Sequence, residues 1–432
     1  YQGAWNPVSG FSDTYSNQIW LNIYDPGVFS HPFTGKTIPI RTDWHVENFG
    51  SDAKITVPDD AISWDIDTQR WENVGVGREA TSKITFDLIL GNWHHEQRMD
   101  MNDILYNMYF LQEWGSELHE GDGTYDSEYS PQAAQNAKTL VGIKPIDDDT
   151  IEVYVDYWHF DEAEIAAWAT PWSSMPWEVI ASMEEAVLDG KISFSRSSST
   201  SKSVNWISLI VPNDAEMIRQ HITEFKESGH IPPSLQNSQH GSEYFESRYN
   251  ASIDWIKEND HAVISNGPFY LDNYSPESRT ITIKAFDSDG YPFKAGKWEK
   301  FEQVEYPKIV DIKIPDTVTL GKLLSIPVET ENSSAIHYFV SNSKGETVVS
   351  GIKSASNNLV EIILTEEDTS RLDVGGNTLK IFASSEEALR PDGYSTSFIA
   401  VEEYTSLPTV PILEAESNVE GVSYPGIASI II

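Results

Sequence analysis

Residues 83–106, KITFDLILGNWHHEQRMDMNDILY, change from the period of a strand to the period of a helix across one polar turn. In the first part, Ile84, Phe86 and Leu88 alternate with polar residues. This alternation is typical of a half-buried strand, because successive side chains point to opposite faces of a sheet. The stretch therefore predicts a strand that ends near residue 88.

The second part of the stretch predicts an amphipathic helix. After the polar turn at 91–96, apolar residues recur at helical spacing from Ile104 onward. Asp100 or Asn102 is expected to cap this helix, because a short polar side chain can accept a hydrogen bond from a free amide of the first turn. We expect the helix to occupy residues 100–118.

The turn between the two elements carries a family resemblance. Trp93-His94-His95-Glu96 resembles the Trp/Phe-His-Asp-Gly turn of the extracytoplasmic solute-binding proteins of peptide and nickel ABC importers, with His-Glu in place of Asp-Gly. Two more segments resemble that family and occur in the same order. They are the early pattern from Trp5-Asn6-Pro7 to Leu21-Asn22-Ile23-Tyr24-Asp25, and the strand entry Asn266-Gly267-Pro268-Phe269-Tyr270-Leu271.

The resemblance covers roughly residues 1 to 300. It implies an α+β or α/β fold, with one lobe like that of a class II periplasmic binding protein. It also implies non-catalytic binding of a small solute, most plausibly a peptide, and delivery to an ABC permease in the membrane. Family members have a second lobe after the Gly-Pro strand, which is expected here in an upstream chain segment or on a separate polypeptide.

The pattern of the sequence changes near residue 306. From residue 308 to 404, seven short β-rich runs are separated by Gly, Asn, Ser and Pro turns. Such spacing predicts an immunoglobulin-like β-sandwich. We therefore expect three regions: 1–305 as the solute-binding region, 306–405 as the sandwich, and 406–432 as a linker with the start of a C-terminal anchor.

Composition limits the classes of partner. The chain has 432 residues with 29 basic and 67 acidic side chains, which leaves a net charge of -38. This charge repels phosphate backbones, so nucleic acid is not an expected partner. There is no cysteine, which excludes disulfides and thiolate metal sites. We expect an extracellular, cell-surface location, with Asn250 and Asn332 as glycosylation sites in Asn-x-Ser sequons.

An aromatic stretch provides the candidate ligand-binding residues. Indole rings offer apolar area and one donor, and an acidic residue commonly meets the ligand ammonium group in the resembling family. Core packing of most of these aromatic residues is the alternative. The candidates are Tyr157, Trp158, Trp168, Trp172 and Trp177, the acidic residues Asp156 and Asp161, and the turn residues His94 and His95.

Helices are also expected at 161–169, 176–189, 213–228 and 243–259, with the Ser-rich segment 193–203 as a linker between two of them.

No catalytic or metal site is expected. The sequence has no Gly-x-Ser-x-Gly elbow, phosphate loop, dinucleotide fingerprint or His-Glu-x-x-His motif. We therefore predict a protein without enzyme activity, cofactor or metal. Two alternatives remain: a surface-layer, filament or adhesin component built on a solute-binding scaffold, and, on tryptophan content alone, a polysaccharide hydrolase.

Overall fold

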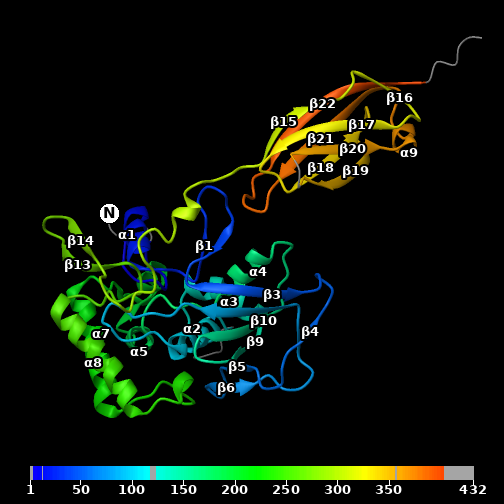
Figure 1. The fold of residues 1–432 in the computed structure, drawn as a ribbon. Helices are drawn as coiled ribbons and strands as arrows, with labels where there is room; N and C mark the ends of the chain where they lie inside the picture. Colours follow the sequence, from blue (N-terminus) through cyan, green and yellow to red (C-terminus); the bar gives the residue numbers. More distant parts are fainter. Residues whose placement is uncertain (1–2, 12, 117–122, 356–357, 403–432) are drawn as a thin grey trace, which may run out of the picture. The chain divides into compact units, whose positions relative to one another are not determined.

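The protein combines α-helices with several separate β-sheets (Figure 1). The computed structural model describes residues 3–11, 13–116, 123–355 and 358–402. The chain divides into two compact units, here called unit 1 (Tyr1–Val304) and unit 2 (from Glu305 onward). The division lies at the point where the sequence changes to short β-rich runs.

Unit 1 contains a six-stranded antiparallel sheet. Its edge strand β3 (Thr42–Asn48) pairs with β8 (Ser82–Leu88), the strand predicted at the start of the 83–106 stretch. Residues of β8 alternate between buried and more exposed positions, which confirms the predicted period. The order continues through β10 (Thr150–Val155), β9 (Leu140–Pro145), β5 (Ile62–Asp65) and β6 (Arg70–Asn73).

Helix α2 (Met101–Trp114) follows the Trp-His-His turn, as predicted. Of the two expected caps, Asp100 has this role: its side chain accepts from the amide of Asn102, and Asp103 reaches back to the amide of Asp100. This reciprocal arrangement satisfies free donors at the start of the helix. The cap therefore fixes where Asn102 and Asp103 lie in the first turn.

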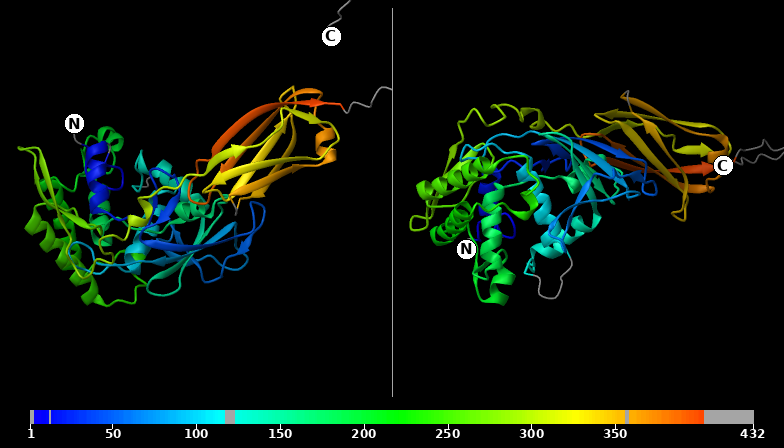
Figure 2. Two further views of the ribbon diagram at one scale, coloured as in Figure 1. Left: turned by 45° about the horizontal axis from the view of Figure 1, so that its top comes forward. Right: turned by 90° about the horizontal axis from the view of Figure 1, so that it is seen from below.

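Several of the other helices gather to one side of the sheet, where α7 and α8 lie side by side (Figures 1 and 2). The expected segments at 161–169, 176–189, 213–228 and 243–259 are helical. The Ser-rich segment expected to be a linker instead forms a helix, α6. The helices besides α2 are α1 (Thr14–Ile23), α3 (Tyr129–Thr139), α4 (Glu162–Ala169), α5 (Trp177–Leu188), α6 (Arg196–Lys202), α7 (Pro212–Ser228), α8 (Ser242–Asn259), and the 3-10 helices η1 (Pro233–Leu235) and η2 (Glu299–Phe301).

Four pairs of short strands complete unit 1. They are β1 (Val28–Ser30) with β2 (Thr37–Pro39), β4 (Ile55–Thr56) with β7 (Glu79–Ala80), β11 (Ile192–Ser193) with β12 (Asn205–Trp206), and β13 (Phe269–Ser275) with β14 (Thr280–Ala285). One large hydrophobic cluster joins the sheet and the helices, and the turn residue Trp93 is fully buried in it.

Unit 2 consists of two β-sheets that share one hydrophobic cluster. Ile326 and Val328 come from the first sheet, and Ile336, Leu379 and Ile381 come from the second. The first sheet contains β15 (Lys308–Ile312), β17 (Leu324–Glu331) and β20 (Leu359–Leu364); the second contains β16 (Thr317–Thr319), β22 (Asp392–Val401), β21 (Gly375–Ser384), β18 (Ala335–Ser341) and β19 (Thr347–Ser354), and a short helix α9 (Glu366–Ser370) follows β20. The predicted pattern lacked β16, which pairs in parallel with β22.

Three expectations concern the surface and the end of the chain: the two glycosylation sites, and the C-terminal linker with its anchor. Asn332 is exposed at a turn, whereas Asn250 lies half-buried within α8 rather than in a loop. The linker and anchor expected at 406–432 lie outside the described residues. Among the helices that are described, none is long and apolar enough to cross a membrane.

Candidate ligand-binding site

The structure does not bring the aromatic candidates together in one cleft. Trp177 is fully buried and packs edge-to-face against Phe245 and Tyr249. Trp172 is also buried, and its indole N–H donates to the carbonyl of Asp25 at 2.9 Å. These two side chains belong to the hydrophobic core, because bulky apolar rings gain most from complete removal from water.

The remaining candidates of this stretch lie nearer the surface but are engaged with other residues. Trp168 stacks on Tyr157 at 4.5 Å between ring centroids. Trp158 is 39% exposed. Asp156 forms an ion pair with Lys54 at 2.6 Å, and Asp161 caps α4 and pairs with Lys36 at 2.8 Å. None of these residues, from Asp156 to Trp177, lines the cavities described below.

The different burial of Trp177 and Trp158 gives a direct test. Replacing Trp177 with alanine should lower the free energy of unfolding by about 3 to 5 kcal/mol, because it leaves a cavity in the core. Replacing the partly exposed Trp158 with alanine should cost much less. Urea unfolding of both variants measures the difference, and equal losses would contradict the assignment of Trp177 to the core.

The turn histidines point into the protein rather than toward a ligand. His94 accepts a hydrogen bond from the amide of Ser265 on Nδ1 and donates from Nε2 to the carbonyl of Gly267 at 3.1 Å. Burial lowers the pKa of His94 to about 3, so the imidazole is neutral. His95 is directed at the carboxylate of Glu178, at 3.1 Å, and burial also lowers its pKa. Both side chains are therefore engaged with protein groups, and neither lines the cavities described below.

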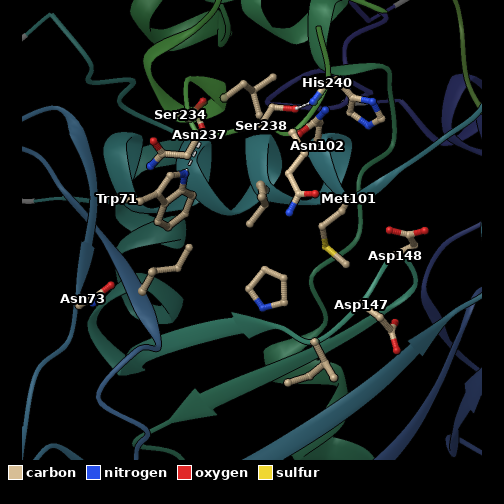
Figure 3. Close-up of a pocket in the computed structure, with 16 residues that line it drawn as sticks. Trp71, Asn73, Met101, Asn102, Asp147, Asp148, Ser234, Asn237, Ser238 and His240 are labelled. Atoms are coloured by element: carbon tan, nitrogen blue, oxygen red, sulfur yellow. Dashed lines mark hydrogen bonds between the residues drawn. The ribbon is translucent and has the colours of Figure 1, made fainter.

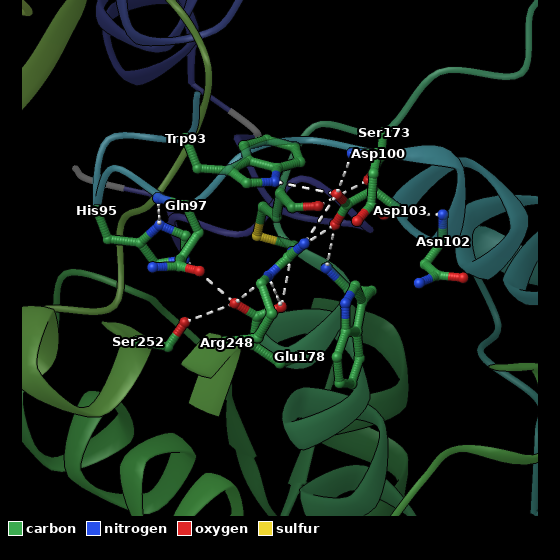
Figure 4. A network of polar contacts seen from close by, with 12 residues as sticks. Trp93, His95, Gln97, Asp100, Asn102, Asp103, Ser173, Glu178, Arg248 and Ser252 are labelled. Atoms are coloured by element: carbon green, nitrogen blue, oxygen red, sulfur yellow. Dashed lines mark hydrogen bonds and ion pairs between the residues drawn. The ribbon is translucent and has the colours of Figure 1, made fainter. Parts of the chain in front are cut away.

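A buried charge cluster lies behind this turn (Figure 4). Arg248 of α8 contacts Asp103 of α2 at 2.6 Å and Glu178 of α5 at 2.8 Å, and all three side chains are almost fully buried. Asp103 also accepts from the indole N–H of Trp93 and from the amide of Trp177. The cluster therefore ties the turn to three helices.

The two carboxylates of this cluster have opposite pKa shifts. Burial opposes ionisation of Glu178, but the charge of Arg248 and the hydrogen bond from His95 outweigh it and lower the pKa to about 2. Burial raises the pKa of Asp103 to about 6, against the attraction of Arg248. The guanidinium of Arg248 is therefore the positive partner of both carboxylates. Its removal would leave Asp103 and Glu178 without that partner.

The larger of two adjoining cavities has a volume of about 530 Å³ and lies in front of the first turn of α2 (Figure 3). Its walls come from β5, β6, the turn between β9 and β10, the first turns of α2, and the loop between α7 and α8. The lining residues are Ile62, Trp71, Asn73, Met101, Asn102, Leu105, Pro145, Ile146, Asp147, Asp148, Ser234, Leu235, Asn237, Ser238, Gln239 and His240.

A second cavity of about 380 Å³ shares Met101, Asp148 and His240 with the first. Its other lining residues include Arg98 and Asp100. Because they share three residues, the two cavities adjoin, and we call them together the groove. His240 lies where they join.

Two residues that line the larger cavity each carry a buried polar atom with no hydrogen-bond partner among the described residues: Asn102 Nδ2 and Ser234 Oγ. The Asn102 residue is 6% exposed and Ser234 is 2% exposed. Figure 3 shows the amide of Asn102 pointing into the cavity. A buried polar group without a partner costs about 1 to 3 kcal/mol, so a water molecule or a ligand group is expected to meet it.

A chain of polar contacts connects the groove to the buried charge cluster. The ring of His240 stacks on Tyr244 at 4.2 Å, and its Nε2 lies 3.7 Å from Asp100 Oδ2. The Tyr244 hydroxyl donates to Asp100 Oδ1 and accepts from Arg248 Nη1, both at 3.1 Å. Burial raises the pKa of this hydroxyl, and the charge of Arg248 partly offsets the rise. His240 and Asp100 are therefore connected through Tyr244 to Arg248 of the cluster.

Sequence patterns did not identify the groove residues as a binding site. Asn102 was expected only as one of two candidate caps for the helix. Trp71 lies in a short strand, Ser234 in the 3-10 helix η1 and His240 in a loop, and none of them belongs to a motif. Within the described ranges, no group of three or more His, Asp or Glu side chains is placed to hold a metal ion.

Comparisons with known proteins add no family. No family model matches the chain, and no curated protein matches it. One matching solved structure is the neutron crystallographic structure of a Jonesia denitrificans lytic polysaccharide monooxygenase, with 13% sequence identity and a TM-score of 0.14. The match covers 20% of this chain and 56% of that chain, and it carries no inference about fold or function.

Proposed function

We propose that this chain is the solute-binding component of an ABC-type importer at the cell surface, and that it holds a small solute in the groove without changing it chemically. The observation that carries the proposal is the pair of buried, unpartnered groups, Asn102 Nδ2 and Ser234 Oγ, in a cavity of about 530 Å³. Ligand pockets commonly have volumes of about 300 to 1,000 Å³ and contain a few placed polar groups.

The three segments that resemble the solute-binding family contact one another, which supports the proposal. Gly267 donates its amide to the carbonyl of Ile23 at 2.8 Å, and the carbonyl of Gly267 accepts from His94. A Cβ atom at Gly267 would lie 2.5 Å from the backbone of Ile23, so only glycine fits. Asn266 Oδ1 accepts from the amide of Asp25. The residues of the resemblance thus have a shared structural role.

In this proposal, unit 1 is one lobe of a class II binding protein and unit 2 is an immunoglobulin-like spacer. A second lobe, on an upstream segment or another polypeptide, would close over the groove, and a membrane permease would receive the solute. The charge cluster also reaches the groove, since Arg248, which pairs with Asp103 and Glu178, is one of the residues that line its second cavity.

The groove should bind a solute, and a bulky side chain that fills the groove should abolish this binding. Short peptides are the first class to test, and a bound solute at 100 times its dissociation constant adds about 2.7 kcal/mol of stability. Leu105 lines the larger cavity, so Leu105→Trp should abolish the thermal shift. Leu111→Trp, on the same helix but outside the cavity lining, is the matched control.

Two results would contradict the proposal. A solute-induced thermal shift that is unchanged in Leu105→Trp would show that the solute binds outside the groove. The absence of a shift with every peptide and sugar, including in the presence of a second lobe, would favour the alternative of a structural surface component. That alternative is supported by the exposed apolar side chains Phe339, Ile352 and Phe382 in unit 2.

A further inference from the structure

The larger cavity offers mainly uncharged hydrogen-bonding groups. Four amide side chains line it, together with two serine hydroxyls and the indole of Trp71. The amides are those of Asn73, Asn102, Asn237 and Gln239. Amides present donors and acceptors together, so a complementary ligand needs groups that can do both.

The two unpartnered atoms further limit the chemical class of the ligand. Asn102 Nδ2 can only donate, so the ligand must present an acceptor to it, and an ammonium group has none. Ser234 Oγ can donate or accept. A carboxylate or a phosphate would satisfy Nδ2, but no lysine or arginine occurs among the described residues that line this cavity. A ligand hydroxyl satisfies both atoms without bringing a charge.

The acidic residues of the larger cavity act against an anionic ligand, whereas Arg98 and Arg248 line only the second cavity. Asp147 and Asp148 line it, and backbone donors from Asp149 and Thr150 help to hold the pKa of Asp147 below its usual value. Asp147 is therefore ionised near neutral pH and repels anions. Carboxylates also accept hydrogen bonds from hydroxyl groups, so the same side chains favour a polyol.

The lining also contains apolar side chains, those of Trp71, Ile62, Met101, Leu105 and Leu235. A sugar ring likewise combines polar and apolar surface, because its hydroxyl groups project from a ring whose C–H bonds form apolar faces. An aromatic ring with neighbouring aliphatic side chains can cover such a face.

From these features we infer that the solute of the larger cavity is an uncharged, polyhydroxylated molecule, that is, a sugar. This inference rests on the proposed solute-binding function and names the ligand class of the same groove. Asn102 and Ser234 are assigned as the deep hydrogen-bonding residues, and Trp71 as part of the apolar wall.

The variant Asn102→Asp separates a sugar from a charged peptide. It keeps the size of the side chain, removes the Nδ2 donor and adds a negative charge. Aspartate is also well tolerated in the first turn of a helix. Sugar affinity should fall on the order of tenfold or more, because Nδ2 no longer meets its acceptor. A ligand held through its ammonium group should instead bind more tightly.

The experiment is calorimetric titration of the full chain with glucose, maltose and cellobiose, and with dialanine and trialanine. Asn107→Asp is the control, because Asn107 lies on the same helix but outside the lining. A sugar that binds wild type and the control, but binds Asn102→Asp at least about tenfold more weakly, supports the inference.

The other outcomes have distinct meanings. Peptide binding without sugar binding overturns the inference and leaves the proposed function standing. A sugar affinity that is equal in Asn102→Asp and wild type overturns the assignment of the cavity. If neither class binds, also in the presence of a second lobe, both the inference and the proposed function fail.

Discussion

Replacing Arg248 with methionine should lower the free energy of unfolding of unit 1 by about 3 to 5 kcal/mol, because the buried carboxylates of Asp103 and Glu178 would lose their positive partner. Methionine keeps much of the volume of the side chain, so the loss reports the charge and its hydrogen bonds. Tryptophan fluorescence during urea unfolding measures it, and all 14 tryptophans lie in unit 1, so unit 2 does not contribute to the signal.

The control for this variant is Arg219→Met. Arg219 pairs with Glu216 on the surface of α7, and such pairs contribute about 0 to 1 kcal/mol. The triple variant Arg248→Met, Asp103→Asn, Glu178→Gln should recover part of the loss, because neutral side chains are cheaper to bury. A loss in Arg248→Met no larger than in the control would show that the cluster does not stabilise unit 1.

Acidification should destabilise unit 1 through His94. In the unfolded chain this imidazole has a pKa near 6.5, and in the folded protein burial lowers it to about 3. The folded state therefore takes up the proton less readily. Its stability is unaffected above pH 6.5 and decreases by about 1.4 kcal/mol for each pH unit between 6.5 and 3. His261, whose pKa burial lowers to about 4, acts in the same direction.

Asp103 acts in the opposite direction, because its raised pKa favours the folded state as the pH falls from about 6 to 3.8. The contribution of His94 is therefore obtained as the difference between wild type and His94→Gln in unfolding experiments at several pH values. The variant should show a flatter pH dependence than wild type. His45→Gln, at an exposed position of β3, should leave the wild-type slope unchanged. Parallel curves for wild type and His94→Gln would rule out this role.

Local patterns allowed many elements to be predicted. The alternation at Ile84, Phe86 and Leu88 predicted β8, and Asp100 was one of two expected caps for α2. These predictions succeed because side-chain period and capping depend on neighbours within a few residues. The helix α6 was missed for a related reason: distant groups stabilise its first turn. The amide of Ser195 donates to Asp126, and the amide of Ser197 donates to Glu128.

The candidate site could not be predicted in the same way. The aromatic density around Trp168 suggested a cleft, yet burial divides these rings between the core and the surface. The groove instead joins short segments from β5, β6, α2 and two loops, and none of its residues belongs to a motif. Which polar atoms lack a partner, such as Asn102 Nδ2, depends on every neighbour in space.

Periodicity, capping residues and composition thus define the strand, the turn and the helix at 83–106, the acidic character of the chain, and the change of pattern near residue 306. Tertiary packing decides that His94 and His95 are buried, that Arg248 meets Asp103 from 145 positions away, and that a groove forms in front of α2. The physical reason is the separation along the chain of the residues that produce each effect. Local order comes from neighbouring residues, whereas burial, pKa shifts and cavities come from segments that only folding brings together.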